Sequence, residues 1–153
     1  LGISSAVHFV GFQQNPFAYI SRSDVLVLSS EWEGLPNILI ESMACETAVI
    51  SADCISGPRE IINPKSNLRY QLKNEIEYGE YGILYPVGSV DLLTESLKEV
   101  LSNEELRNKF IEKGKVRIKD FDEQKIASAY LGILKMSSTS KNTLIVESPH
   151  QLR

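Results

Sequence analysis

The sequence is poor in cysteine and has no long apolar run, and each absence excludes a class of protein. Its 153 residues include only two cysteines, Cys45 and Cys54. Two cysteines cannot form a disulfide framework or a typical zinc ligand set, so we expect a reducing, cytoplasmic setting and no metal site. No apolar run approaches the roughly 20 residues that a membrane-spanning helix needs. These features are typical of an ordinary globular protein.

Basic charge is also scarce. The chain carries 16 Lys and Arg against 20 Asp and Glu, which gives a net charge of -4. Binding to a nucleic-acid backbone needs a concentrated basic face, and the lysines here are dispersed. We therefore expect no nucleic-acid partner. A length of 153 residues with 42% apolar residues fits one domain with a real core.

Short apolar runs alternate with helical patterns along the chain. This alternation predicts an α/β fold, a Rossmann-like, mostly parallel sheet with helices on both faces. The runs that we expect to be strands are Val7–Phe12, Val25–Leu28, Ala48–Ser51 and Gly82–Pro86. Three helices are expected over Phe17–Ser21, Asn37–Cys45 and Arg59–Ile62. Three more are expected from their capping residues. The first is capped at Ser89 or Asp91, the second has a Ser102–Glu105 capping box and ends at Gly114, and the third is capped at Asp122.

Two stretches lack this periodicity. Residues 63–80 are polar and contain Pro64, which predicts a long surface loop. After Lys135 the composition becomes rich in serine and threonine, so we expect a domain over residues 1–135 and a flexible tail over residues 136–153. Because the chain begins with Leu1 and enters a strand almost at once, we expect an upstream domain to be missing.

The stretch from Ser29 to Glu60 holds the candidate site. The carboxyl ends of parallel strands share one rim, where ligands of such sheets bind. The helix expected to begin near Asn37 exposes backbone N–H groups and a positive dipole end to an anion such as a diphosphate. Gly34 allows a ligand to approach the backbone closely. Glu33 and Glu41 flank this anion site as acceptors for sugar hydroxyls. The rim thus suits a sugar linked through a diphosphate to a nucleoside.

Simpler interpretations remain for each feature. Two glutamates eight positions apart are common in proteins, and charged side chains usually cover a solvated face. A Gly-Leu-Pro sequence is most often an ordinary turn. Trp32, beside Glu33, either covers the loop or forms a wall of the sugar pocket.

The wider context resembles one family. The run Ser30–Cys45 (SEWEGLPNILIESMAC) resembles the E-x7-E motif of glycosyltransferase family 4, retaining enzymes of the GT-B fold. The flanking segments resemble other motifs of that family, from about Val7 to Lys135. They are Phe9–Phe12 (FVGF), Ser23–Ser29 (SDVLVLS), Val49–Ile50 with Gly57–Ile61 (GPREI), and Gly82–Val87 (GILYPV).

The resemblance implies a role for each site residue. Glu41 would hold the ribose hydroxyls, and Glu33, the catalytic candidate, would contact the transferred sugar. The loop that contains Phe12 would lie near the nucleobase, and Arg59 would be the basic residue available to the diphosphate. The backbone amides that would meet the diphosphate belong to the run Leu35, Pro36, Asn37 and Ile38, of which Pro36 has no N–H group.

The resemblance also implies the reaction and the partners. A retaining enzyme of this kind transfers a hexose or related sugar from a nucleotide-sugar donor to a glycan or lipid-linked acceptor, without a metal or other cofactor. The acceptor-binding N-terminal domain, with the family's basic residues for the phosphates, would precede Leu1 and could carry a peripheral contact with the cytoplasmic membrane face. We therefore expect this chain alone to bind donor weakly and to transfer nothing. A sugar-nucleotide epimerase of the same fold and a non-catalytic nucleotide-binding or partner-binding domain stay open as alternatives.

One departure from the family pattern affects the helix of the motif. Glu46 stands where the family usually has a helix-ending glycine, and Ala48 stands where it usually has proline. We therefore expect the exit of this helix to be less tightly fixed.

Overall fold

The computed structural model describes residues 2–139 and divides the chain into two units, residues 1–119 and residues from 120 onward. The first unit contains the sheet and all the candidate site residues. None of the described helices is both long enough and apolar enough to cross a membrane.

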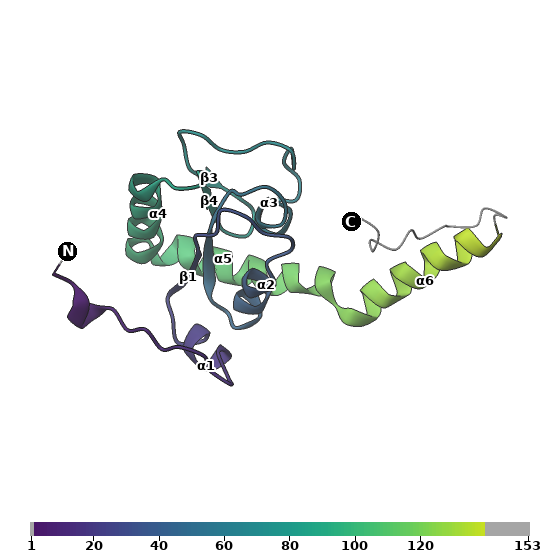
Figure 1. The fold of residues 1–153 in the computed structure, drawn as a ribbon, viewed down its shortest axis with the longest axis horizontal. Coiled ribbons are helices and arrows are strands. Elements are labelled where there is room, and N and C mark those ends of the chain that lie inside the picture. The colour runs from purple at the N-terminus through teal and green to yellow at the C-terminus, as the bar shows by residue number, and fades with distance from the viewer. Residues whose placement is uncertain (1, 140–153) are drawn as a thin grey trace, which may run out of the picture. The chain divides into compact units, whose positions relative to one another are not determined.

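The first unit is built on a four-stranded sheet with the order β1-β2-β4-β3 (Figure 1). The strands β1, β2 and β4 are parallel, and β3 pairs with β4 in the antiparallel direction. This topology confirms the predicted α/β class with a mostly parallel sheet. The strands span Val25–Leu28 (β1), Ala48–Ala52 (β2), Glu77–Tyr78 (β3) and Ile83–Tyr85 (β4).

Helices cover both faces of the sheet. In Figure 1, α4 (Val90–Ser102) lies to one side of the strands, and α2 (Asn37–Ala44) and α3 (Pro58–Ile62) lie to the other. On the α4 face, alternate β2 residues pack with Val100 of α4 and Phe110 of α5 (Glu104–Arg117). The central strand β2 is buried along its whole length, as expected for a strand that is covered on both faces.

Two helix ends differ from the sequence prediction. Ser89 caps α4 as expected, since its Oγ accepts a hydrogen bond from the amide of Leu92. The cap of α5, however, is Asn103, whose Oδ1 accepts from the amide of Leu106 at 3.0 Å, and not Ser102. Gly114 does not end α5 but lies inside it. A Cβ atom there would lie 3.2 Å from the Met43 side chain on α2, so the glycine allows α5 and α2 to pack closely.

The exit of α2 is well fixed despite the missing glycine. Glu46 adopts a left-handed conformation with φ of 59°. Its amide donates to Met43 O at 3.1 Å, and the amide of Thr47 donates to Ser42 O at 2.9 Å. These two bonds form a Schellman motif, which normally uses glycine. The expectation of a loosely fixed exit was wrong, because the hydrogen bonds outweigh the backbone strain of Glu46.

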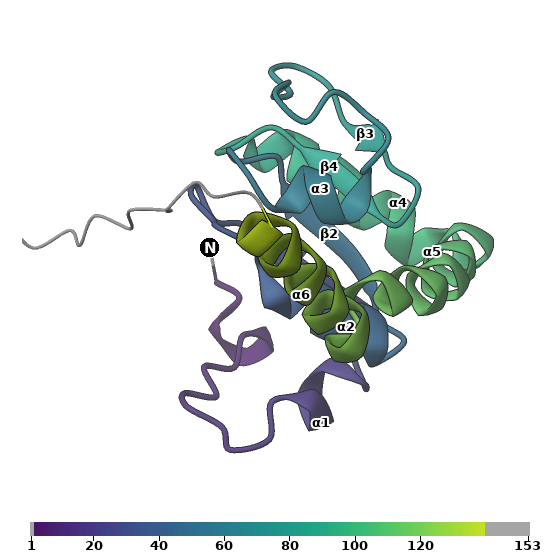
Figure 2. The same cartoon turned by 90° about the vertical axis from the view of Figure 1, so that its right-hand side faces the viewer.

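The segment Val7–Phe12 does not form the predicted buried strand. Its residues have no regular secondary structure and are exposed, with Phe9 at 96% and Phe12 at 92%. A strand needs a partner to satisfy its backbone, and no described strand pairs with this segment. β1 is an edge strand of the described sheet, and all four of its residues are only partly buried. The short helices η1 (Ser4–Ala6) and α1 (Phe17–Ile20) flank the segment, which is part of the purple ribbon that leads to α1 in Figure 2.

The polar stretch over residues 63–80 is a loop for most of its length, as predicted, but it is anchored. It ends in the short strand β3, and Leu72 within it is only 6% exposed. The loop rises above the strands at the top of Figure 1 and returns to the sheet at β3.

The second unit contains one long helix, α6 (Glu123–Thr139), preceded by η2 (Ile118–Phe121), which spans the boundary between the units. Asp122 caps α6 as predicted, because its Oδ1 accepts from the amide of Lys125 at 3.1 Å. The helix extends four residues beyond the expected domain end at residue 135. The rest of the expected tail lies outside the described residues. Four of its large apolar side chains are exposed: Ile126, Tyr130, Ile133 and Leu134.

Candidate active site

The loops that follow β1 and β2 lie side by side at the carboxyl rim of the sheet. Trp32 and Ile55 form an isolated parallel bridge between the two loops. Next to it, Ser56 Oγ donates a hydrogen bond to the backbone carbonyl of Glu33 at 3.1 Å. The bridge continues the β1–β2 pairing past the ends of the strands, and so the second loop holds the backbone that carries Glu33.

Gly57 brings the two loops into direct contact. It has φ of +87°, and a Cβ atom there would lie 2.4 Å from Gly34 O and 2.5 Å from Pro36 Cδ. No larger residue fits between these atoms, and L-residues rarely adopt this backbone conformation. Gly57 therefore fixes the position of the Gly34–Pro36 turn, from which α2 starts.

The start of α2 is open to a ligand. Pro36 is the N-cap residue, with extended backbone and no side-chain cap. The first amide of this turn with a protein acceptor belongs to Leu39, which donates to Pro36 O at 3.0 Å. Within the described residues, the amides of Asn37 and Ile38 donate to no protein group. These N–H groups and the helix dipole can bind an anion.

Glu33 and Glu41 lie on either side of this helix start. Both are partly buried, so their carboxylates are neither sealed in the core nor fully hydrated. Glu41 follows Asn37 by four residues and therefore lies on the same face of α2. Helical side chains also lean toward the helix N-terminus, which directs Glu41 toward the open amides. The side-chain carboxylates of Glu33 and Glu41 make no hydrogen bond or ion pair within the described residues.

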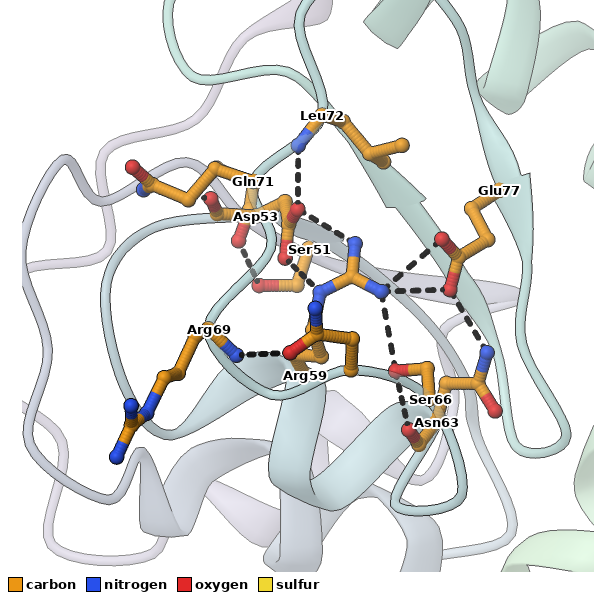
Figure 3. Close-up of polar contacts among 11 residues, drawn as sticks. Ser51, Asp53, Arg59, Asn63, Ser66, Arg69, Gln71, Leu72 and Glu77 are labelled. Atoms are coloured by element: carbon orange, nitrogen blue, oxygen red, sulfur yellow. Dashed lines mark hydrogen bonds and ion pairs between the residues drawn. The ribbon is translucent and has the colours of Figure 1, made fainter.

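Arg59 is used inside the protein and does not reach the rim as a free cation (Figure 3). It is 3% exposed. Its Nε and Nη2 atoms donate to the two carboxylate oxygens of Asp53 at 3.0 and 2.6 Å, and Nη1 donates to Glu77 at 2.9 Å and to Ser66 Oγ at 3.1 Å. The sequence suggested a contact between Arg59 and the diphosphate. The structure assigns the guanidinium to a buried network instead.

Asp53 is the centre of this network. Besides Arg59, its Oδ2 accepts from the amide of Leu72 at 2.7 Å, and its backbone carbonyl accepts from Gln71 Nε2 at 3.2 Å. It thereby fastens the distant loop of residues 63–76 to the end of β2, as Figure 3 shows. No buried side-chain nitrogen or oxygen of the described residues lacks a partner, so the network is complete.

Burial and charge shift the pKa values of two groups beside the rim. Burial opposes the positive charge of Arg59, but the hydrogen bonds that it donates to Asp53 and Glu77 outweigh this effect, so the pKa of Arg59 is raised. Burial, followed by the charges of Glu33 and Asp53, raises the pKa of the Cys54 thiol. Cys54 therefore stays protonated and unreactive at neutral pH.

The structure brings together most of the residues selected from the sequence. Gly34 and Asn37 are exposed at the rim, and so is Leu35, which is 49% exposed. Phe12 is the exception, because no described hydrogen bond or ring contact joins its exposed side chain to the site. No group of three or more His, Cys, Asp or Glu among the described residues could hold a metal ion.

Sequence reasoning missed the contribution of the second loop. In the sequence, Gly57 stood out only as the first residue of the Gly57–Ile61 segment, and Ser56 was not singled out. The Ser-Gly-Pro sequence indicates an unusual backbone conformation, but it does not show which segment packs against the glycine. The position of Asp53 at the end of β2 indicates that it lies at the rim, but the sequence does not predict its ion pair with Arg59.

Comparison with known proteins identifies relatives. The family model "Glycosyl transferases group 1" matches residues 1–117. The chain is 36% identical over 142 residues to an uncharacterized glycosyltransferase of Methanocaldococcus jannaschii, covering 82% of this chain and 34% of that protein. It is 33% identical over 127 residues to a Campylobacter jejuni N-acetylgalactosaminyltransferase named for a diphospho-undecaprenol-linked substrate, covering 83% of this chain and 31% of that protein.

Solved structures share the fold. A HepE structure from Anabaena in complex with UDP matches with a TM-score of 0.70 at 18% identity, covering 91% of this chain and 34% of that one. Sucrose-phosphate synthase from Thermosynechococcus elongatus matches with a TM-score of 0.68 at 22% identity, covering 90% and 32%. The chain thus spans about a third of the length of the proteins it matches. The family match and the sequence identities together show that the chain belongs to the glycosyl transferases group 1 family.

Proposed function

We propose that this chain is the donor-binding domain of a retaining glycosyltransferase, which transfers a hexose or related sugar from a nucleotide-diphosphate sugar to a glycan or lipid-linked acceptor. The observation that carries the proposal is the open start of α2, with two unpartnered amides between Glu33 and Glu41. An anion site between two carboxylates suits a ligand with phosphate at its centre and hydroxyl groups at both ends.

Each residue of the site has a specific role in this proposal. The amides of Asn37 and Ile38, with the exposed backbone at Gly34 and Leu35, bind the diphosphate and stabilise the charge that develops on it as the sugar leaves. Glu41 accepts hydrogen bonds from the ribose hydroxyls. Glu33 accepts from the transferred sugar and orients it. Because the amides and the helix dipole supply the positive potential, we propose a metal-independent reaction.

Arg59 acts indirectly in this proposal. Its guanidinium is buried with Asp53 and Glu77, and so it supports the loop after β2 in place of contacting the phosphates. We propose that an additional domain of the complete protein supplies the basic groups that would strengthen phosphate binding. We accordingly propose that the 153-residue chain binds nucleotide weakly and does not transfer sugar by itself.

The relatives support the class of substrate. The names of two of them, from Campylobacter jejuni and Salmonella typhimurium, state transfer of N-acetylgalactosamine to a diphospho-undecaprenol-linked glycan and of galactose in lipopolysaccharide. The Anabaena structure contains UDP. Acceptors of this lipid-linked kind favour a cytoplasmic location with peripheral attachment to the membrane through other parts of the complete protein.

Calorimetric titration of the chain with UDP, GDP and ADP tests the donor site. We expect weak binding of one of these nucleotides, and a reduction of at least ten-fold in Glu41→Ala, since a hydrogen bond to a charged group contributes about 1.5–3 kcal/mol. Glu31→Ala, an exposed glutamate of the same loop, serves as the matched control and should bind like the unmodified chain. Equal binding by the Glu41→Ala and Glu31→Ala variants, or no binding of any nucleotide at millimolar concentration, would contradict the proposal.

The catalytic assignment needs a complete enzyme that contains this domain. There, Glu33→Ala should lower kcat more than it raises KM, because Glu33 contacts the sugar that reacts. NMR of the first-formed product should show the anomeric configuration of the donor. Inversion of that configuration, or unchanged kinetics of Glu33→Ala, would exclude the retaining mechanism or the role of Glu33.

A further inference from the structure

A groove of about 300 Å³ adjoins the candidate site. It lies between the loop after β2 and the tip of the long loop of residues 63–76. Its volume is at the lower end of the range for small-molecule sites, which is enough for one small ring. Its lining includes Ile55, Ser56, Glu60, Arg69, Tyr70 and Gln71.

The groove shares a wall with the site of sugar transfer. Ser56 lines the groove and also donates to the carbonyl of Glu33 at 3.1 Å. Ile55 lines it and bridges to Trp32, the residue before Glu33. A ligand in the groove would therefore lie one loop away from a sugar held at Glu33.

Tyr70 provides an aromatic surface in this groove. Its ring is 5.5 Å from the Arg59 guanidinium carbon, and the residue remains 46% exposed. The amide of Tyr70 donates to Asn67 O at 3.0 Å, which fixes the turn that presents the ring. Because Arg59 is held by the buried network, the ring is positioned before any ligand arrives.

The polar residues around the groove favour a neutral, hydroxyl-rich ligand. Glu60 and Arg69 are both exposed and carry opposite charges, so the rim has no net charge that would select an anion. The Ser56 hydroxyl and the Gln71 amide add further hydrogen-bonding groups. An apolar surface beside donors and acceptors matches a pyranose ring, which has C–H faces and peripheral hydroxyls.

We propose that this groove binds a sugar ring of the acceptor, next to the sugar that is transferred. This inference rests on the proposed function, because that function places the transferred sugar at Glu33. It adds that the acceptor contacts this domain through Tyr70 and the loop after β2, and not only through another domain.

Amide NMR of the full 153-residue chain tests the inference. Methyl α-D-galactopyranoside and methyl N-acetyl-α-D-galactosaminide are the probes, and UDP is titrated separately. We expect the glycosides to shift the amides of Ile55, Ser56 and residues 69–71, with dissociation constants in the millimolar range of about 1–10 mM. Tyr70→Ala should weaken glycoside binding at least ten-fold, and Tyr70→Phe should retain it because the ring remains. Tyr78→Ala removes an exposed tyrosine outside the groove and should have no effect.

The results separate this inference from the proposed function. If UDP shifts Asn37 and Ile38 while neither glycoside shifts the groove up to about 100 mM, the acceptor subsite is excluded and the donor site stands. If a UDP-sugar displaces the glycosides, the groove belongs to the donor and the acceptor assignment is wrong. Glycoside binding at the groove together with failure of all nucleotides would leave a sugar site but remove the proposed transfer, and with it the acceptor role. Equal effects of Tyr70→Ala and Tyr78→Ala would also overturn the inference.

Discussion

The two loops at the rim of the sheet differ in how their polar groups are used. The loop after β1 ends at the start of α2, where the amides of Asn37 and Ile38 have no described protein partner. The segment after β2 begins with Asp53, whose carboxylate is 1% exposed and fully occupied by Arg59 and the amide of Leu72. One loop keeps its polar groups available for a ligand, and the other uses them to hold its own position. A rigid support beside an open set of donors is the arrangement that preorganised binding requires.

The largest effect should come from the buried network. Asp53→Ala leaves the Arg59 guanidinium without its main counter-charge and frees the long loop. We expect the free energy of unfolding to fall by about 3–5 kcal/mol, as for other broken buried ion pairs. Urea unfolding followed by circular dichroism measures it.

The matched change in the other loop is Glu33→Ala, which should alter the free energy of unfolding by no more than about 0.5 kcal/mol, because its carboxylate has no described partner. Similar losses for both variants would remove the proposed difference between the loops. Failure of the Asp53→Ala variant to fold would agree with it.

A smaller effect is expected where the loops touch. Gly57→Ala places a Cβ atom 2.4 Å from Gly34 O and requires φ of +87°. We expect a loss of about 2–4 kcal/mol from backbone strain and overpacking, together with weaker UDP binding because the start of α2 shifts. Thermal unfolding and calorimetric titration measure the two effects.

Gly88→Ala is the control for this substitution. Gly88 also has positive φ, +75°, but nothing lies within 4 Å of a Cβ atom there. Its loss should therefore be limited to backbone strain, about 1–2 kcal/mol, with UDP binding unchanged. Equal losses for the two alanine variants would show that contact between the loops is unimportant.

The smallest expected effect is stabilising and concerns the exit of α2. Glu46 is strained at φ of 59° but forms an exposed ion pair with Lys115 at 2.9 Å. Glu46→Gly relieves the backbone strain and removes an exposed ion pair that contributes little to stability. We therefore expect a gain of about 0.5 kcal/mol in the free energy of unfolding. Urea unfolding at low and high salt checks it. A loss that disappears at high salt would mean that the ion pair, not the backbone, dominates at this position.

Local pattern was a good guide where neighbouring residues determine the structure. The strands β1, β2 and β4 begin within a residue or two of the predicted positions, because continuous apolar runs between turns can be read directly. The start of α2 and the caps at Ser89 and Asp122 were also predicted, since capping depends on a few adjacent residues. The strand positions and the start of α2 are together enough to place open backbone amides at the rim of the sheet.

The sequence by itself determined the class of fold, the rim and the residues that surround the open helix start. Tertiary structure alone decided which residues support that site. The burial of Arg59 depends on its contacts with Asp53 and with Glu77, which lies eighteen residues further along the chain. The importance of Gly57 depends on its contact with Gly34, because that contact leaves no room for a side chain. The segment Val7–Phe12 failed as a strand for the complementary reason, since an apolar run forms a strand only when another strand pairs with it. Local propensity is encoded within a few residues, whereas partners are chosen by the whole fold.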